Sequence, residues 1–391
     1  MRRLLGSTLL IAGTTIGAAM LALPIDTGAM GFFPAAALFI VVWLALMATA
    51  FYFMEVALHT PKDSNMITMA GQTLGPLGMG LCTVVYILLL YALVCSYLSG
   101  GASAFHSAAV GWLGADISFS FAVILFSLLF GTFIYLGTAS VDRVNQILFL
   151  GLVLSFFLMF GLSLPKVDGT KLLASRPHNI WSGIAIAVTS FGFHIVIPTL
   201  RDYLGRNIVA MRKALWIGGS LPLLFYLMWN ASFLGILPSY EIERALQQSE
   251  LPQVLLQRYL GSSAIVTIAS LFSFFAIITS FLGVSISLLD FIADGLKIRK
   301  GRIGRLALCL LVFIPPIAFV LSDPKGFYKA LRFGGIMVTI LLGVFPPLMV
   351  LAQRKKKRSG YRVPGGRFLI YAVLVFFLAV LAVTISLVCS N

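Results

Sequence analysis

Long apolar runs, separated by short polar segments, follow one another along the whole chain. A bilayer core about 30 Å thick needs about 20 apolar residues per helix. Only helices and closed barrels cross it, because lipid leaves exposed backbone groups unpaired. The runs are continuous rather than alternating, so we predict an all-α integral membrane protein with eleven transmembrane helices. These cover residues 4–30, 32–56, 79–106, 118–137, 143–163, 182–201, 212–236, 263–293, 302–322, 331–353 and 367–389.

Two of these runs are interrupted near their middle by small and polar residues. The first reads IAGTTIGAAMLALP, with the cluster from Gly13 to Gly17 ahead of Pro24. The sixth reads AVTSFGFHIVIPTL, with the cluster from Ser190 to His194 ahead of Pro198. Gly costs about 1 kcal/mol against Ala inside a helix, and backbone freed within the membrane is tolerated only when it is buried or lines a cavity. We therefore predict two broken helices; close helix packing through small residues is the alternative interpretation.

The two interruptions also indicate an internal repeat. Interrupted segments at corresponding positions of two halves are typical of transporters built from inverted repeats. Each cluster lies in the first helix of a five-helix half, which divides a single transporter domain into a first repeat (about 4–163), a second repeat (about 182–353) and an extra helix (about 367–389). The N-terminus of a half-helix suits a carboxylate, and its C-terminal carbonyls suit an ammonium group or a small cation. Two adjacent breaks are therefore expected to bind a neutral zwitterion.

Charged residues make up only 10% of the chain, and none lies in the middle of a predicted helix. A site for sugar phosphates or inorganic anions would require buried Arg or Lys, so this distribution favours a neutral amino acid. With the N-terminus in the cytosol, 20 of the 28 Lys and Arg fall on cytosolic segments, in agreement with the positive-inside rule. We expect a cytosolic N-terminus and an outer C-terminus, and we attribute the net charge of +15 to topology rather than to nucleic-acid binding.

At this point the chain resembles a known family. The two interrupted segments, together with TSFLGVSISLLDFIADGL and GYRVPGGR, are similar to the hydroxy/aromatic amino acid permeases, and the tyrosine and tryptophan permeases of bacteria match best. The resemblance implies a five-plus-five inverted-repeat fold of the leucine-transporter type, with helices 1 and 6 broken. It also implies ion-coupled import of an aromatic amino acid across the cytoplasmic (inner) membrane. One departure is Ala19, where the family usually has Gly, and it leaves the substrate preference open.

The resemblance also places the substrate between the two breaks. It implies that the α-carboxylate meets backbone N–H groups near Thr15, Ile16 and Gly17. The α-ammonium would meet carbonyls near Gly13 and around Ser190 to Gly192. Aromatic and small polar side chains from the second break and from the third predicted helix are expected to surround the ring. The full set of expected substrate contacts is Gly13, Thr14, Thr15, Ile16, Gly17, Tyr91, Ser96, Tyr97, Ser190, Phe191, Gly192, Phe193 and His194.

Two groups are candidates for the coupling ion. His194 is the only histidine inside a predicted helix, and an ionisable group at membrane depth is a functional candidate. It would accept the transported proton or bind a substrate hydroxyl; a neutral His bonded to a freed carbonyl is the alternative. Thr279 and Ser280, on the eighth predicted helix, match the hydroxyl pair that binds Na⁺ in sodium-coupled relatives of this fold. Bonding to the helix's own carbonyls is the alternative for this pair, and proton or sodium coupling stays open.

Acidic residues near helix ends suggest a gate on the cytosolic side. Asp290 and Asp294 lie one turn apart at the end of the eighth predicted helix, and Arg2 and Arg3 precede the first. We expect ion pairs between the two sets to close the inner side; solvated end residues are the duller alternative. Glu55, near the end of the second predicted helix, is interpreted as such a solvated residue.

Other classes of protein fit the sequence less well. A channel would need a continuous polar stripe along several helices, and an enzyme would need a nucleophile–base pair or a metal cluster; we find neither pattern. The four Cys and the remaining His show no metal-ligand spacing, so we predict no enzyme, no metal and no cofactor. The expected partners are an aromatic amino acid, a proton or sodium ion and the lipid bilayer. Tyrosine is the first candidate substrate, and tryptophan or another neutral amino acid the alternative; the oligomeric state is left open.

Overall fold

The computed structural model describes residues 2–114, 117–174, 181, 183–260, 264–356 and 360–389, and over these residues the chain forms helices and no strand. The α-helices are α1 (Arg2–Thr15), α2 (Ala18–Asp26), α3 (Phe32–His59), α4 (Met66–Leu113), α5 (Phe119–Leu136), α6 (Thr138–Ser163), α7 (Gly169–Leu173), α8 (Ile184–Ser190), α9 (Ile197–Tyr203), α10 (Ile208–Ile236), α11 (Ser239–Gln248), α12 (Pro252–Leu260), α13 (Ala264–Leu296), α14 (Arg302–Ser322), α15 (Phe327–Val338), α16 (Phe345–Lys356) and α17 (Gly366–Cys389). Short 3-10 segments η1 (Gly28–Met30), η2 (Leu164–Lys166) and η3 (His194–Val196), and the π-helical η4 (Thr339–Val344), lie between some of them.

The number of membrane-spanning segments agrees with the sequence. Ten segments of the described residues are long and apolar enough to cross a membrane, and the bent pair α1–α2 gives an eleventh. The sixth predicted helix is α8, η3 and α9 in succession, and the tenth is α15, η4 and α16. The third begins earlier than predicted, because α4 starts at Met66 and continues through a kink at Gly75. The φ of 81° at Gly75 is a conformation that glycine adopts without strain.

Both predicted interruptions are true breaks. The first separates α1 from α2 at Ile16 and Gly17, with a bend of 52°. The second separates α8 from η3 at Phe191 to Phe193. The prediction of broken helices 1 and 6 is therefore confirmed.

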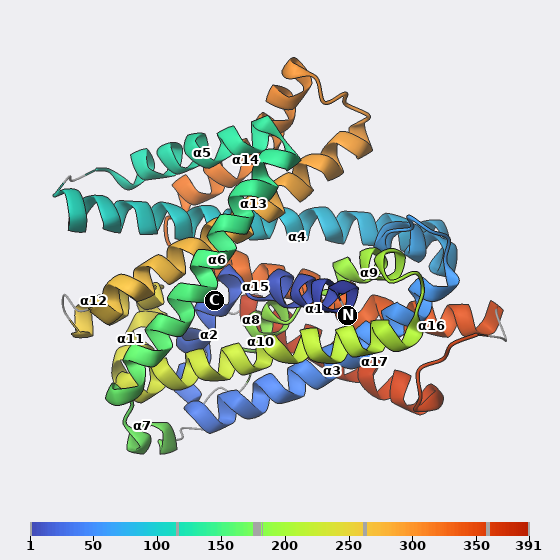
Figure 1. Cartoon of the computed structure of the whole chain (residues 1–391), viewed down its shortest axis with the longest axis horizontal. Coiled ribbons are helices and arrows are strands. Elements are labelled where there is room, and N and C mark those ends of the chain that lie inside the picture. Colours follow the sequence, from blue (N-terminus) through green and yellow to red (C-terminus); the bar gives the residue numbers. More distant parts are fainter. Residues whose placement is uncertain are drawn as a thin grey trace.

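The helices form two groups, and the breaks lie where the groups meet (Figure 1). In one group α13 packs against α6 and α4, and α14 packs against α4 and α5. In the other, α1 packs against α10, and α3 packs against α9, α10 and α16. The second part of the first broken helix, α2, contacts both α8 and α13, and α15 contacts both α4 and α8. Residues near the two breaks are thus close to each other and to both groups.

Candidate functional site

The first break is paired with a hydroxyl from the opposite group of helices. The backbone N–H of Ala18, the first residue of α2, donates to Ser280 Oγ over 2.9 Å. Gly17 makes this approach possible, since a Cβ there would clash with the same hydroxyl. The Ser280 oxygen thus occupies the N-terminus of a half-helix, which is the kind of position that suits an anionic oxygen.

Thr279, the neighbour of Ser280, has a different environment. Its Oγ1 donates to the carbonyls of Phe275 and Ala276 over 2.8 and 3.1 Å, both on its own helix α13. The two hydroxyls predicted to bind the coupling ion therefore have different hydrogen-bond partners. Thr14 and Thr15 on α1 also donate within their helix, to the carbonyls of Leu10 and Ile11.

The second break is buried and surrounded by aromatic rings. Phe191 and Phe193 are 1% and 2% exposed. The Phe191 ring lies 6.5 Å from that of Phe39 and 4.9 Å from that of Tyr226, centroid to centroid. Such separations are typical of favourable aromatic pairs. Aromatic side chains therefore line the interior next to the freed backbone.

His194 lies directly after this break, wholly buried, with an asymmetric set of partners. Its Nε2 is 2.8 Å from Thr49 Oγ1 on α3. Thr49 Oγ1 also lies 3.0 Å from the carbonyl oxygen of Leu46, so its single proton serves either that carbonyl or Nε2. Nδ1 has no hydrogen-bond partner within the described part of the chain.

Tyr226, on α10, joins the two breaks, and the sequence analysis missed it. Its hydroxyl oxygen lies 2.8 Å from the carbonyl oxygen of Thr15 and 2.6 Å from that of Ser190. These residues are the last of α1 and of α8. Because nothing in the local sequence of the seventh apolar run distinguishes Tyr226 from its aromatic neighbours, only the fold reveals it.

The three candidates on the third membrane-spanning helix separate. Tyr97 is 5% exposed. Ser96 instead donates to the carbonyl of Phe327 on α15 over 2.9 Å, and Tyr91 donates to that of Leu311 on α14 over 2.9 Å. Ser96 and Tyr91 thus bind helices other than the broken ones.

The expected inner ion pairs are not formed among the described side chains. Asp290 pairs with Lys300 over 2.8 Å, with both side chains 40% exposed, and Asp294 is exposed. The Arg3 guanidinium lies over the ring of Tyr203, 6.0 Å from its centroid. The side chain of Arg2 lies outside the described part of the structure. These groups are therefore apart in this conformation.

Three ion pairs each contain a charged side chain that is wholly or almost wholly buried. Glu55, interpreted above as a solvated residue, is 1% exposed and accepts two hydrogen bonds from Arg354, at 2.7 and 2.6 Å, and one from the Val363 N–H, at 2.7 Å. That interpretation is therefore wrong, because the carboxylate joins α3 to α16 and to the segment before α17.

The other two pairs lie at opposite ends of the broken helices. Asp26, at the end of α2, is wholly buried and bonded to Arg332 of α15. Arg201, near the end of α9, is also wholly buried. It pairs with Asp202 and donates to Ala57 O and Thr60 Oγ1 at the end of α3, over 3.1 Å each.

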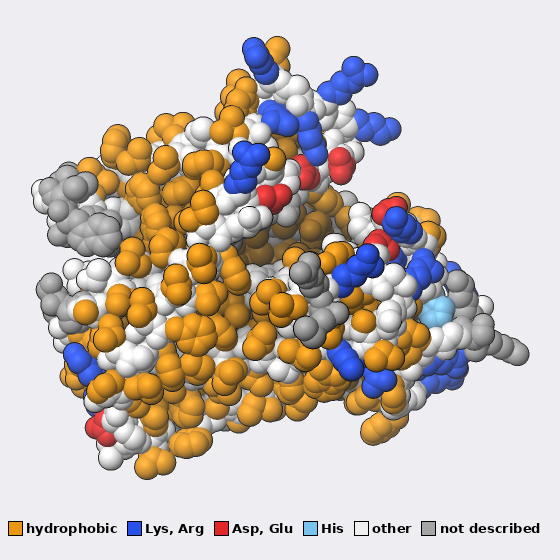
Figure 2. Space-filling view, viewed as in Figure 1, with side chains coloured by type: hydrophobic (Ala, Val, Ile, Leu, Met, Phe, Trp, Pro, Cys, Tyr) orange, Lys and Arg blue, Asp and Glu red, His pale blue; other side chains and the backbone are white. Residues whose placement is uncertain are grey.

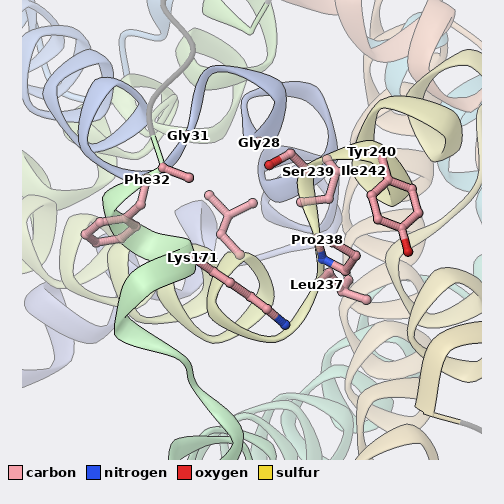
Figure 3. Close-up of a pocket in the computed structure, with 11 residues that line it drawn as sticks. Gly28, Gly31, Phe32, Lys171, Leu237, Pro238, Ser239, Tyr240 and Ile242 are labelled. Atoms are coloured by element: carbon pink, nitrogen blue, oxygen red, sulfur yellow. The ribbon is translucent and has the colours of Figure 1, made fainter.

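A separate cavity of about 230 Å³ lies near the loop between α10 and α11. Figure 3 shows Lys171 and Tyr240 beside it, and no residue of either break lines it. Lys171 Nζ donates to the carbonyl of Ile236 over 2.6 Å. Nearby, Asp168 caps α7, and hydrogen bonds from Thr170 hold the pKa of that carboxyl below its usual value. This cavity is distinct from the site between the breaks.

Comparison with known proteins agrees with the sequence resemblance. Residues 1–384 match the tryptophan/tyrosine permease family. The chain is 37% identical to the tyrosine-specific transport system 1 of Haemophilus influenzae, over 96% of this chain and 94% of that protein. It is 30% identical to the tryptophan-specific transport protein of the same organism, over 95% and 93%.

The fold is also found in a solved structure. The crystal structure of the manganese transporter of Eremococcus coleocola superposes with a TM-score of 0.66, covering 98% of this chain and 86% of that one at 14% identity. At that identity the likeness concerns the fold alone. Together with the eleven spans and the two breaks, it confirms the predicted fold class.

Proposed function

The chain belongs to the tryptophan/tyrosine permease family, and from this premise we propose that it imports tyrosine by secondary active transport. Relatives named as tyrosine-specific are 37% and 33% identical to it. Relatives named as tryptophan-specific reach 30%, so tryptophan is the second candidate. Both are neutral zwitterions with an aromatic side chain.

The observation that carries this proposal is the convergence of the two breaks. Tyr226 contacts the ends of both α1 and α8, so free carbonyls from two half-helices lie within one small region. The N-terminus of α2 lies next to it, and its first N–H, that of Ala18, is bonded to the Ser280 hydroxyl. This arrangement supports a site in which α2 holds the carboxylate, the carbonyls hold the ammonium, and Phe191, Phe193 and Tyr97 contact the ring.

Alternating access is supported by the unequal burial of the first broken helix. Every residue of α2 is buried, and its end is closed by the pair Asp26–Arg332. By contrast α1 exposes Leu5, Leu10 and Thr14. Figure 2 shows a hollow between the α1 region and the part of the molecule that holds α13 and α14. We assign this conformation to the inward-facing state, closed toward the outside.

The distribution of charge supports the orientation. In Figure 2 most Lys and Arg of the visible face gather at the end that holds α9, α16 and the α13–α14 turn. The positive-inside rule assigns such an end to the cytosol. We therefore propose that the protein lies in the cytoplasmic membrane with its N-terminus in the cytosol and its C-terminus outside.

A proton is the proposed coupling ion, and His194 its acceptor. The Nδ1 nitrogen is buried and unpartnered among the described residues. The hydroxyl of Thr279 donates within α13 and Ser280 accepts from Ala18, but both oxygens keep lone pairs, so sodium stays the alternative ion. His194 also lies directly after the second break, beside the proposed substrate.

The function is tested by uptake of labelled L-tyrosine and L-tryptophan into proteoliposomes under an imposed proton or sodium gradient. We expect saturable, proton-driven accumulation of tyrosine and counter-exchange of preloaded substrate. His194→Ala should abolish accumulation but retain exchange, with His106→Ala as the control. Uptake of neither amino acid would refute the permease proposal, uptake without saturation or exchange would indicate a channel, and accumulation driven by sodium alone would refute the role of His194.

A further inference from the structure

Tyr226 lies in the middle of α10, wholly buried, with its phenol directed at both breaks. Its hydroxyl oxygen is 2.8 Å from Thr15 O and 2.6 Å from Ser190 O. Thr15 and Ser190 end their half-helices. The last carbonyls of a helix lack intrahelical partners and carry partial negative charge. One side chain thus joins the two negative ends.

The cluster formed by the Tyr226 hydroxyl and the two carbonyls has fewer hydrogen-bond donors than acceptors. A phenol has a single O–H, yet two carbonyl oxygens lie within hydrogen-bond distance of it. One carbonyl receives the proton fully, or the two share it weakly. Three oxygen atoms therefore surround one hydrogen in a buried place, and leaving an acceptor there unsatisfied is unfavourable. A group that brings several N–H donors and a positive charge would complete the cluster.

The phenol is also held firmly. The Phe191 ring packs 4.9 Å from the Tyr226 ring, tilted by 59°. Phe39 also packs against Phe191, and α10 itself packs along α1. Tyr226 comes from a helix that is not broken. It therefore offers a fixed reference point for two chain ends that have no regular helical partner.

We propose that Tyr226 is a positioning residue for the α-ammonium of the substrate. Its hydroxyl brings the carbonyls of Thr15 and Ser190 to one point and donates to one of them. The other carbonyl and the phenol's lone pairs then accept from the ammonium. This inference rests on the proposed amino acid transport and names the group on the substrate that Tyr226 serves.

The test compares Tyr226→Phe with Tyr52→Phe in displacement of labelled L-tyrosine from the purified full chain. Tyr52 is an apt control, because it is equally buried and its hydroxyl has no partner among the described residues. The competitors are L-tyrosine, tyramine, which lacks the carboxylate, and 3-(4-hydroxyphenyl)propionate, which lacks the ammonium. Thermal midpoints of both variants report on folding.

We expect Tyr226→Phe to weaken L-tyrosine and tyramine about tenfold, as for loss of a hydrogen bond to a charged group. The propionate should change by less than about twofold, and Tyr52→Phe should leave all three unchanged. Equal weakening of all ligands, or none, would overturn the proposal. If the propionate competes with neither protein, unchanged inhibition by tyramine overturns it.

Two further outcomes are distinguished from a failure of this proposal. If the wild-type chain binds neither tyrosine nor tryptophan, the proposed function fails and not the geometry of the cluster. If Tyr226→Phe does not fold, the wild-type chain still decides, because the proposal requires that removal of the ammonium weaken binding about tenfold or more. Propionate and L-tyrosine of equal affinity would then refute it.

Discussion

The two broken helices are interrupted at corresponding positions, but their half-helices have different partners. Beyond the second break, His194 is bonded to Thr49, and Arg201 is bonded to the end of α3. The first half of the first broken helix, α1, packs mainly against α10 and is partly exposed. The two interruptions therefore give one half-helix that is bonded to α3 through buried side chains and one that packs mainly along α10 and is partly exposed.

This difference suggests that the two half-helices behave differently during transport. Segments with few buried contacts open at low free energy, whereas segments bonded within the core do not. We expect α1 to move during transport while α9 stays with α3. Glu55 strengthens the fixed side, since it joins α3 to Arg354 of α16. The substitutions below first remove a contact between α9 and α3 and then change residues at the first break.

Arg201→Met should have the largest effect, because it removes a wholly buried guanidinium and leaves Asp202 and the end of α3 without their partner. Each lost hydrogen bond to the charged guanidinium costs about 1.5–3 kcal/mol. We expect a clear fall in the thermal midpoint of the purified protein. Arg3→Met, at the exposed start of α1, is the control and should stay within about 0.5 kcal/mol. Equal midpoints for the two variants would contradict an anchored α9.

Gly17→Ala should have the next largest effect, on transport. The added Cβ would clash with Ser280 Oγ, and overpacking of this kind costs about 1–3 kcal/mol. We expect kcat/KM for uptake to fall about tenfold. Gly161→Ala is the control, since a Cβ there meets no atom within 4 Å.

A second substitution sharpens this test. Ser280→Gly in the Gly17→Ala background removes the clashing hydroxyl, and part of the lost activity should return. If the double variant is no better than Gly17→Ala alone, contact with Ser280 is not the reason for glycine at this position.

Ser280→Ala should have the smallest effect and the opposite sign for binding. It leaves the Ala18 N–H without its acceptor in the empty protein, at a cost of about 0.5–2 kcal/mol, as for loss of a helix cap. A substrate carboxylate restores that bond, so tyrosine should bind a few-fold more tightly and stabilise the variant more than the wild type. Thermal shift with and without tyrosine measures this.

The adjacent residue provides the control. Thr279→Val removes a hydroxyl that bonds only to carbonyls of its own helix, so we expect affinity within about twofold of the wild type. Weaker binding in Ser280→Ala would contradict the competition between Ser280 and the carboxylate. Loss of sodium-dependent uptake in Thr279→Val would favour the sodium alternative.

The sequence was sufficient for the framework of the fold and for the location of both breaks. Continuous apolar runs reveal spanning helices, and clusters such as Gly13 to Gly17 are costly inside a helix, so their presence carries information. The start of α4 was missed, because its residues before Gly75 are less apolar and precede a kink.

The partners within the site were not accessible in the same way. Ala18 and Ser280 are 262 residues apart, and Tyr226 is 211 residues from Thr15. No local pattern distinguishes a tyrosine that bridges two helix ends from one that faces lipid. Glu55 was misjudged for the same reason, since its partner Arg354 lies 299 residues away.

The carboxylate of Glu55 has a consequence for the last helix. It accepts from the Val363 N–H as well as from Arg354, and Arg354 also donates to the carbonyl of Val363. The segment that leads into α17 is thereby bonded to α3 through Glu55, so the position of α17 is tied to that of α3. A chain cut just before α17 would keep all of these bonds, whereas one cut after Lys356 would keep the pair Glu55–Arg354 and lose only the two bonds to Val363.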